Sequence, residues 1–177
     1  MATPVKTIPR PEYNGDPEAL LDAVEREDLE TVITLIDAGI DIEYSNKDGE
    51  DSCEGMTAMI YTASMAGYPN NVAIMKELIR GGGDVNNAGV YGWTPLQICA
   101  YWRGDEEMIK LLVNAGADID ATIESHHGSR EEGQTALHAA MNMCNCCAVK
   151  TLVQLGANTE VKDNAGRTVF MVMGDEV

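Results

Sequence analysis

A short pattern occurs four times along the chain, and no other feature constrains the fold as strongly. A glycine is followed two residues later by Asp or Asn and three residues later by Ile, Val or Thr. A Leu-Ile or Leu-Val pair lies four and three residues before each glycine. This sequence is typical of an apolar helix that ends in a left-handed glycine. The glycines are Gly39, Gly82, Gly116 and Gly156, and each predicts the end of a helix.

A second pattern, Gly-x-Thr followed by apolar residues, alternates with the first and begins at Gly55, Gly92, Gly133 and Gly166. A Thr at this place caps a helix, because its side chain accepts hydrogen bonds from the free N–H groups of the first turn. Pro95 follows one such Thr, where its missing N–H costs little. Each unit is therefore a turn, a short helix, a tight connection and a second helix. We expect helices at 20–26, 29–37, 57–66, 71–80, 94–102, 106–114, 135–143 and 147–154, and no sheet beyond short hairpins in the turns.

The start of the first helix in these units resembles the Thr-Pro-Leu-His pattern of the ankyrin family. Thr94-Pro95-Leu96-Gln97 and Thr135-Ala136-Leu137-His138 match it well, and Thr57-Ala58-Met59-Ile60 matches it loosely. The resemblance covers residues 18–171 and implies an all-α ankyrin-repeat solenoid: about four helix-turn-helix repeats with β-turn fingers, plus a C-terminal half-repeat cap. It divides the chain into an N-terminal arm (1–17) and one domain (18–177), with units at about 18–44, 45–87, 88–121 and 122–161 and a half-repeat at 162–177.

The charge of the chain bears on its partners. The formal net charge is −17, and the region from Glu12 to Glu43 contains eleven carboxylates but one basic residue, Arg26. Nucleic acids and anionic membrane surfaces attract the opposite charge, so we expect neither as a partner. The acidity has two interpretations: it keeps a monomer soluble, or it also attracts a partner protein with a basic segment. We expect a monomer.

The cysteines and the apolar runs bear on location. No run approaches the about 18 apolar residues of a membrane-spanning helix, and residues 1–11 lack the apolar core of a secretory signal. An odd number of cysteines, three of them close together, is a poor disulfide framework. We therefore expect reduced thiols and a cytoplasmic or nuclear location. The cysteines are Cys53, Cys99, Cys144, Cys146 and Cys147.

The fourth unit concentrates the soft metal ligands of the chain. Structural zinc usually takes separated Cys-x2–4-Cys and His-x3–5-His pairs, a spacing that these residues lack. Alignment of the units places Cys146 where a buried Leu is usual, and the resemblance implies that the ring of His138 bonds to the neighbouring turn. We expect no metal and no cofactor. The competing functional class is a metal- or small-ligand-binding protein that uses this unit. Its ligands would come from His126, His127, His138, Cys144, Cys146 and Cys147.

Nothing in the sequence predicts catalysis. The carboxylates lie at solvent-facing positions, whereas acid–base chemistry needs a pair in a water-poor cleft. Residues 81–83, Gly-Gly-Gly, close a helix and lack the Lys-Ser/Thr of a phosphate-binding loop. We expect no enzymatic activity.

The aromatic residues of the third unit are the candidate binding residues. The ankyrin resemblance implies a concave groove that is lined by finger residues one, three and four before each Thr and by helix residues seven and eight after it. In the third unit these positions hold Trp93, Tyr91, Val90, Tyr101 and Trp102, which include both tryptophans of the chain. The tryptophans could instead be partly covered residues that bridge adjacent fingers. The usual exposure of these positions favours a binding role.

Methionines and carboxylates complete the predicted site. The neighbouring units offer Met56, Met65 and Met143, and Glu131 and Glu132 contribute to an acidic rim. An apolar centre with an acidic rim suits a partner that has an apolar anchor and basic flanks. We therefore predict a protein–protein interaction module that binds a partner protein through its concave groove.

Overall fold

The computed structural model describes residues 15–45, 55–65, 67–89, 92–102, 104–124 and 131–172. These residues form short α-helices joined by turns, and the eight predicted helices are found with bounds that differ by at most two residues. The inner row of helices contains α1 (Ala19–Glu25), α3 (Ala58–Ser64), α5 (Pro95–Trp102), α7 (Ala136–Asn142) and α9 (Val169–Val172). The outer row contains α2 (Leu29–Asp37), α4 (Asn71–Arg80), α6 (Glu106–Asn114) and α8 (Cys146–Gln154).

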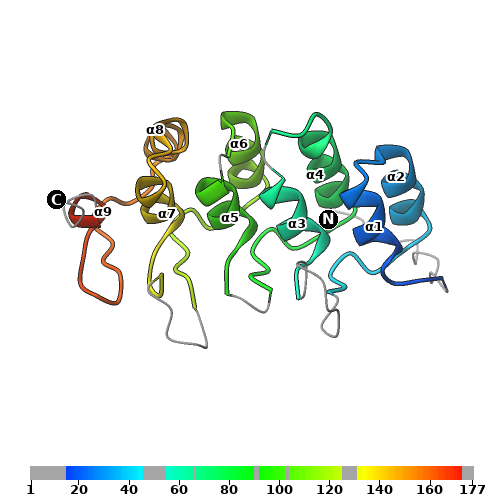
Figure 1. The fold of residues 1–177 in the computed structure, drawn as a ribbon, viewed down its shortest axis with the longest axis horizontal. Helices are drawn as coiled ribbons and strands as arrows, with labels where there is room; N and C mark the ends of the chain where they lie inside the picture. The colour runs from blue at the N-terminus through cyan, green and yellow to red at the C-terminus, as the bar shows by residue number, and fades with distance from the viewer. Residues whose placement is uncertain are drawn as a thin grey trace, which may run out of the picture.

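The helices form two parallel rows, with the turns projecting as fingers from the inner row (Figure 1). Each inner helix packs against the next inner helix, and each outer helix packs against the next outer helix. The α1–α2 pair lies at one end of the array and α9 at the other. This is the predicted all-α solenoid. In the described part of the chain, no helix combines the length and the apolar character needed to cross a membrane.

Side-chain caps fix where the helices begin. Oγ1 of Thr57, Thr94 and Thr135 accepts a hydrogen bond from the backbone N–H three residues later, at 3.4, 3.3 and 3.5 Å. Three of the outer helices use Asp or Asn for the same purpose, because their first N–H groups also lack partners within the helix. These caps are Asp28 on α2, Asp105 on α6 and Asn145 on α8.

Glycines end the outer helices as predicted. The φ angles of Gly39, Gly82, Gly116 and Gly156 are 87°, 89°, 99° and 94°. These are left-handed conformations that strain any residue with a Cβ atom. The N–H of the residue after each glycine turns back to a carbonyl five residues earlier; the bond from residue 117 to residue 112 is 3.0 Å long. The pattern matches a Schellman helix end.

A polar ladder joins the turns that follow the outer helices. Glu43, Asn86 and Asp120 each lie four residues after one of the helix-ending glycines. Each side chain accepts a hydrogen bond from a backbone N–H of the next unit, at 2.7, 2.8 and 2.8 Å. The acidic or amide residue four positions after each of these three glycines is therefore partly structural.

The core is aliphatic and continuous along the array. The residue two positions after each capping Thr (Met59, Leu96 or Leu137) is only 1% exposed. Strand pairing is slight within the described residues: an isolated bridge joins Ser45 and Thr57. The expectation of no sheet beyond short finger hairpins is thus confirmed for the described part of the chain.

Candidate partner-binding surface

Three aromatic rings cluster at the end of α5. The centroids of Tyr101 and Trp102 are 5.4 Å apart with their planes at 77°, and Trp93 makes an edge-to-face contact of the same distance and angle with Tyr101. Trp102 is 53% exposed, whereas Trp93 and Tyr101 are partly buried. Edge-to-face contacts of this kind stabilise an aromatic cluster beyond the burial of its surface. The rings therefore form a supported apolar surface with Trp102 as its most exposed member.

The α5 helix under this surface is firmly held. The N–H of Thr94 donates to Oε1 of Gln97 at 2.8 Å, and Nε2 of Gln97 donates to the carbonyl of Ala121 at 2.8 Å. Gln97 is 1% exposed. Its side chain thus links the start of α5 to the base of the next finger, which reduces the freedom of α5 to move when a ligand binds.

The structure brings some of the predicted site residues to this surface and covers others. Met143 is 46% exposed at the end of α7, whereas Met56 and Met65 are partly buried. Val90 and Tyr91 lie outside the described residues. The prediction that both tryptophans are exposed holds for Trp102, but Trp93 is half covered because its ring packs against Tyr101. The binding role of all these residues stays a prediction.

The residue before Thr135, the capping Thr of the fourth unit, is not exposed. Gln134 is 2% exposed, and its Oε1 accepts a hydrogen bond from Nδ2 of Asn142 at 2.9 Å. The expectation of a solvent-facing residue here is wrong, because these two amides bond to each other across adjacent positions of the groove.

The predicted acidic rim is also partly structural. Glu131 and Glu132 are both partly buried. The carbonyl of Glu132 accepts from the N–H of Asn164 at 3.2 Å, and its Oε2 accepts from Nδ2 of the same residue at 3.3 Å. Glu132 therefore joins the fourth finger to the fifth.

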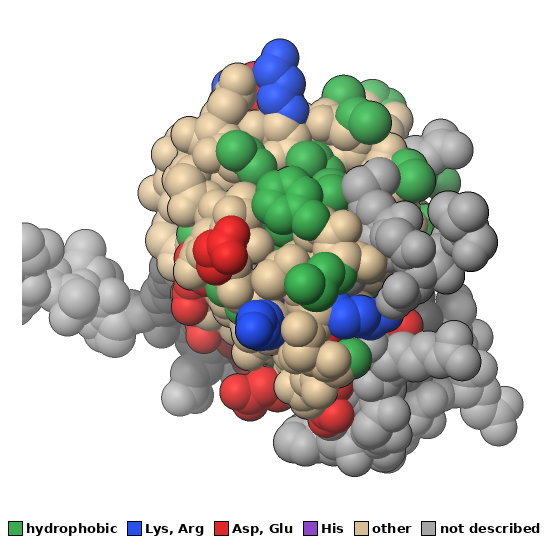
Figure 2. Space-filling model, turned by 90° about the vertical axis from the view of Figure 1, so that its left-hand side faces the viewer, with side chains coloured by type: hydrophobic (Ala, Val, Ile, Leu, Met, Phe, Trp, Pro, Cys, Tyr) green, Lys and Arg blue, Asp and Glu red, His purple; other side chains and the backbone are tan. Residues whose placement is uncertain are grey.

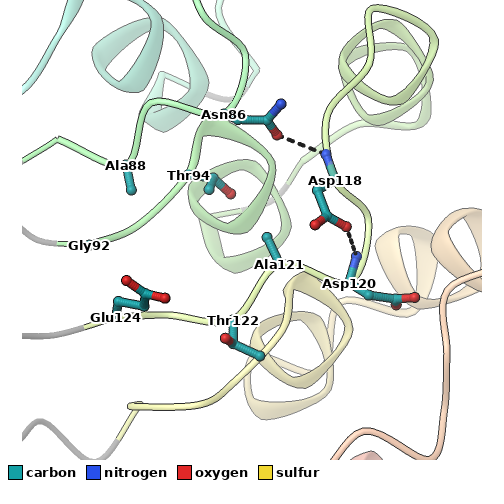
Figure 3. Close-up of a pocket in the computed structure, with 9 residues that line it drawn as sticks. All are labelled: Asn86, Ala88, Gly92, Thr94, Asp118, Asp120, Ala121, Thr122 and Glu124. Atoms are coloured by element: carbon teal, nitrogen blue, oxygen red, sulfur yellow. Dashed lines mark hydrogen bonds between the residues drawn. The ribbon is translucent and has the colours of Figure 1, made fainter.

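A pocket of about 400 Å³ is lined by turn residues of the second, third and fourth units, and it shares no residue with the predicted surface. Figure 3 shows Asn86 and the carboxylates of Asp118, Asp120 and Glu124 around it. Oδ1 of Asp118 accepts from the N–H of Asp120, and Oδ1 of Asp120 accepts from the N–H of Asn158. These carboxylates thus already serve the finger turns, so the pocket offers no separate evidence for a ligand.

The candidate metal ligands of the fourth unit that the structure describes form no metal-binding group. Among the described residues, no group of three or more His, Cys, Asp or Glu could hold a metal ion. His126 and His127 lie outside the described residues. The burial predicted for Cys146 is wrong: α8 begins at Cys146, which is exposed. Ala148, two residues later, is the buried residue in this turn. The competing ligand-binding class gains no support.

His138 has the structural role that the resemblance implied. Its Nδ1 accepts from the N–H of Thr135 at 3.2 Å, so Nε2 carries the proton and faces the carbonyl of Arg167 at 3.3 Å. Burial lowers the pKa of His138, although the bond to the Arg167 carbonyl opposes the shift. His138 therefore does in the fourth unit what Gln97 does in the third, with the addition of a titratable group.

Asp163 and Cys99 are buried ionisable groups with opposite pKa shifts. Burial tends to raise the pKa of Asp163, but hydrogen bonds from the backbone N–H and the guanidinium of Arg167 outweigh it and hold the pKa below its usual value. Burial, with a smaller effect of Asp105, raises the pKa of the Cys99 thiol far above its usual value. Cys99 is therefore an inert core residue, because the thiolate is the reactive form.

A second apolar surface lies at the C-terminal end of the array. Phe170 and Met171 of α9 are 65% and 56% exposed, and Val153 of α8 is 48% exposed. Figure 2 views this end and shows apolar side chains near its middle, with basic and acidic side chains around them. Sequence reasoning missed this surface because it treated residues 162–177 only as a half-repeat cap.

Comparison with known proteins decides the family. A model of three ankyrin repeats matches residues 20–123, and a model of one ankyrin repeat matches residues 132–164. The chain belongs to the ankyrin-repeat family. Ankyrin repeats generally serve as protein–protein interaction modules and not as enzymes. The coarse expectation of a protein-binding module is thereby supported.

Several curated proteins are similar to part of the chain. Human SH3 and multiple ankyrin repeat domains protein 2 is 40% identical over 77 residues, which cover 44% of this chain and 4% of that protein. Human SH3 and multiple ankyrin repeat domains protein 1 is 36% identical over 88 residues, which cover 48% and 4%. Neurogenic locus notch homolog protein 1 of Xenopus tropicalis is 35% identical over 98 residues, which also cover 48% and 4%. The chain thus spans a small part of the length of these relatives.

Proposed function

We propose that this ankyrin-repeat chain binds a partner protein through the surface at the end of α5, with Trp102 as the main anchor. The observation that carries the proposal is the 53% exposure of Trp102 on a ring cluster that Tyr101 and Trp93 support from behind. A single exposed apolar residue is common, but a group of neighbouring apolar side chains at the surface marks a binding site more often. Tryptophan is also prominent among the residues that dominate binding energies.

The neighbouring repeats extend this surface along the inner row. Met65 and Met143 follow their capping threonines by eight residues, as Trp102 does, so the three side chains occupy equivalent places on consecutive inner helices. Methionine adapts its shape to a contacting group more readily than branched residues do. The surface therefore suits an apolar side chain of the partner at its centre, beside the rings of α5.

The charge of the first repeat favours basic residues elsewhere in the partner. Residues 15–45 contain ten carboxylates and one basic residue, Arg26, which is paired with Asp22 at 3.5 Å. Such a field raises the association rate of a positively charged partner and is screened by salt. Raising the salt concentration should therefore slow association and leave dissociation nearly unchanged.

Affinity capture from the source cell with three forms of the protein tests the proposal. The wild type, Trp102→Ala and Tyr68→Ala are compared by quantitative mass spectrometry. Tyr68 is a matched control because it is 51% exposed but lies on the connection between α3 and α4. Proteins held by the proposed surface should be lost with Trp102→Ala and kept with Tyr68→Ala. Equal recovery by all three forms would show that the anchor lies elsewhere.

A further inference from the structure

Three exposed cysteines lie within four residues at the connection between α7 and α8. They are Cys144, Cys146 and Cys147, and all three are free thiols. Cys99, by contrast, is buried in the core. An exposed thiol adds little to packing, and its exposure makes it accessible to oxidants. Packing therefore does not account for these three cysteines.

The backbone brings Cys144 and Cys146 close together. The N–H of Cys146 donates to the carbonyl of Cys144 at 2.9 Å, and Asn145 between them has a φ of −79° and a ψ of 79°. These angles form an inverse γ-turn. Such a turn folds the chain back on itself, so the Cα atoms of its first and third residues lie within the range of about 4.4–6.8 Å that disulfides span. The Sγ atom of Cys146 lies 3.6 Å from the carbonyl oxygen of Cys144, so its side chain points back to that residue.

Three hydrogen bonds hold this turn in place. The N–H of Asn145 donates to the carbonyl of Ala140 at 2.9 Å, and its Nδ2 donates to the carbonyl of Ala100 on α5 at 3.3 Å. Its Oδ1 accepts from the N–H of Ala148 at 3.2 Å. Because the residue between the two cysteines is fixed, joining their side chains costs little further conformational entropy.

The first unit shows that this turn does not require cysteine. There the N–H of Leu29 donates to the carbonyl of Glu27 at 3.1 Å, and Asp28 between them has a φ of −83° and a ψ of 83°. Leu29 packs against the core, whereas Cys146 at the same place is exposed. Cys144 has a left-handed φ of 51°, which disfavours residues with a Cβ atom. The fourth unit thus keeps the turn of the first unit and adds a pair of thiols to it.

We propose that this turn is a reversible oxidation site at which a hydroperoxide joins Cys144 and Cys146 in a disulfide. In the first step the sulfur of one cysteine attacks a peroxide oxygen, and the O–O bond breaks. That oxygen stays on the sulfur as a sulfenic acid, and the rest of the peroxide leaves as an alcohol or as water. In the second step the other sulfur attacks the first, the S–O bond breaks, and the hydroxide leaves as water with the proton of the second thiol. The two thiols lose two electrons, and the peroxide takes them up.

The same geometry makes the oxidation reversible. The disulfide closes a loop of three residues, so it constrains the unfolded chain little and adds little to the stability of the fold. Both cysteines are exposed, and exposed disulfides are the more easily reduced ones. A dithiol reductant therefore restores the two thiols.

Cys147 is a matched control within the cluster, because it is also exposed and lies one residue further along α8. Its side chain is turned by about 100° around the helix from that of Cys146. A disulfide between Cys146 and Cys147 would also distort the peptide bond that joins them in the first turn of α8. We therefore expect one pairing, Cys144 with Cys146.

Peroxide treatment of four reduced proteins tests the site. Wild type, Cys144→Ser, Cys146→Ser and Cys147→Ser are treated with dilute hydrogen peroxide, and free thiols and disulfide-linked peptides are measured by alkylation and mass spectrometry. Wild type and Cys147→Ser should lose two thiols per chain and regain both with dithiothreitol. Cys144→Ser and Cys146→Ser should form no disulfide and should accumulate a sulfenic acid that dimedone traps.

Oxidation of the wild type in urea separates the effect of the fold from that of closeness in sequence. The unfolded chain should give a mixture of pairings that includes Cys147, whereas the folded chain should give the pair of Cys144 and Cys146. The proposal is overturned if the folded chain gives the same mixture as the unfolded one. It is also overturned if the main disulfide of the folded chain contains Cys53 or Cys147 or joins two chains, or if the thiols pass to sulfinic acid without a disulfide.

Discussion

The ring cluster of α5 and the C-terminal end both expose large apolar side chains, yet they differ in how that exposure arises. Trp102 lies at the end of an inner helix. The equivalent residues of the neighbouring units are Met65 and Met143, and neither of them is fully buried. Phe170 occupies a position that is 1% exposed in the complete units. The exposure of Trp102 is thus a property of the repeat, whereas Phe170 lies on α9, where none of the described residues supplies the outer helix that the complete units have.

The difference shows how an exposed apolar residue in a repeat protein can be interpreted. A residue such as Trp102 can be replaced without leaving a cavity, so the amino acid at this position can be chosen for binding at little cost in stability. A residue such as Phe170 retains the character of the core, and a further helix would restore its burial. Comparing equivalent positions separates these cases, whereas exposure alone does not.

The largest effect on stability should come from the buried counterpart of Phe170. Leu96→Ala should lower the free energy of unfolding by about 2–5 kcal/mol, because it leaves a cavity between packed helices. Phe170→Ala should lower it by less than about 1 kcal/mol, since a largely exposed side chain leaves no such cavity. Urea denaturation of both variants measures the two values. Similar losses would show that Phe170 is buried in solution.

A smaller loss should follow from weakening the fifth finger. Asp163→Asn should cost about 1–3 kcal/mol, because the side chain is buried and bonds to both the backbone and the guanidinium of Arg167. Repeat arrays couple mainly to nearest neighbours. Hydrogen exchange should therefore accelerate in α9 and leave α5 unchanged. Equal acceleration of exchange in α9 and α5 would contradict the expectation that the change affects only the neighbouring repeat.

The pH dependence of stability should distinguish the third repeat from the fourth. The pKa of His138 is lowered in the folded state. Below about pH 6.5 the imidazole is therefore protonated more readily in the unfolded chain than in the folded chain. Stability from this group is therefore present above the unfolded pKa and is lost as the pH falls, by up to about 1 kcal/mol between pH 7 and 5.5. His138→Gln, which copies Gln97, should remove this part of the dependence in urea denaturation. An unchanged pH profile in the variant would show that His138 titrates normally in the fold.

The sequence predicted the scaffold because each unit repeats its own signals. Thr94 and Thr135 mark helix starts and Gly116 and Gly156 mark helix ends through local backbone chemistry, which needs no knowledge of distant contacts. The details that failed depend on neighbours. Alignment of the units placed Cys146 at a buried position of α8, but the buried residue is Ala148, two residues later.

The candidate site was predictable in position but not in exposure. The resemblance predicted that Tyr101 and Trp102 lie in the last turn of the first helix of their unit, and the structure has them at the end of α5, since their distance from the capping Thr is fixed. Gln134 is buried and bonds to Asn142 eight residues later, and the partial burial of Trp93 accompanies its ring contact with Tyr101. No local pattern reports such pairings. The exposure of Phe170 could have been found by aligning it with Leu96 and Leu137.

A variant of Trp102 tests most directly the central claim that the exposed ring at the end of α5 serves binding and not stability. The measurement is a pair of curves, thermal unfolding and binding of a captured partner, for Trp102→Ala and for the control Tyr68→Ala. Truncation of an aromatic anchor commonly costs about 2–4 kcal/mol of binding, so Trp102→Ala should weaken the complex by roughly 30- to 1000-fold. Its unfolding curve should stay close to that of the wild type. A strong shift in unfolding with no loss of binding would show that Trp102 belongs to the core and that the proposed surface is wrong.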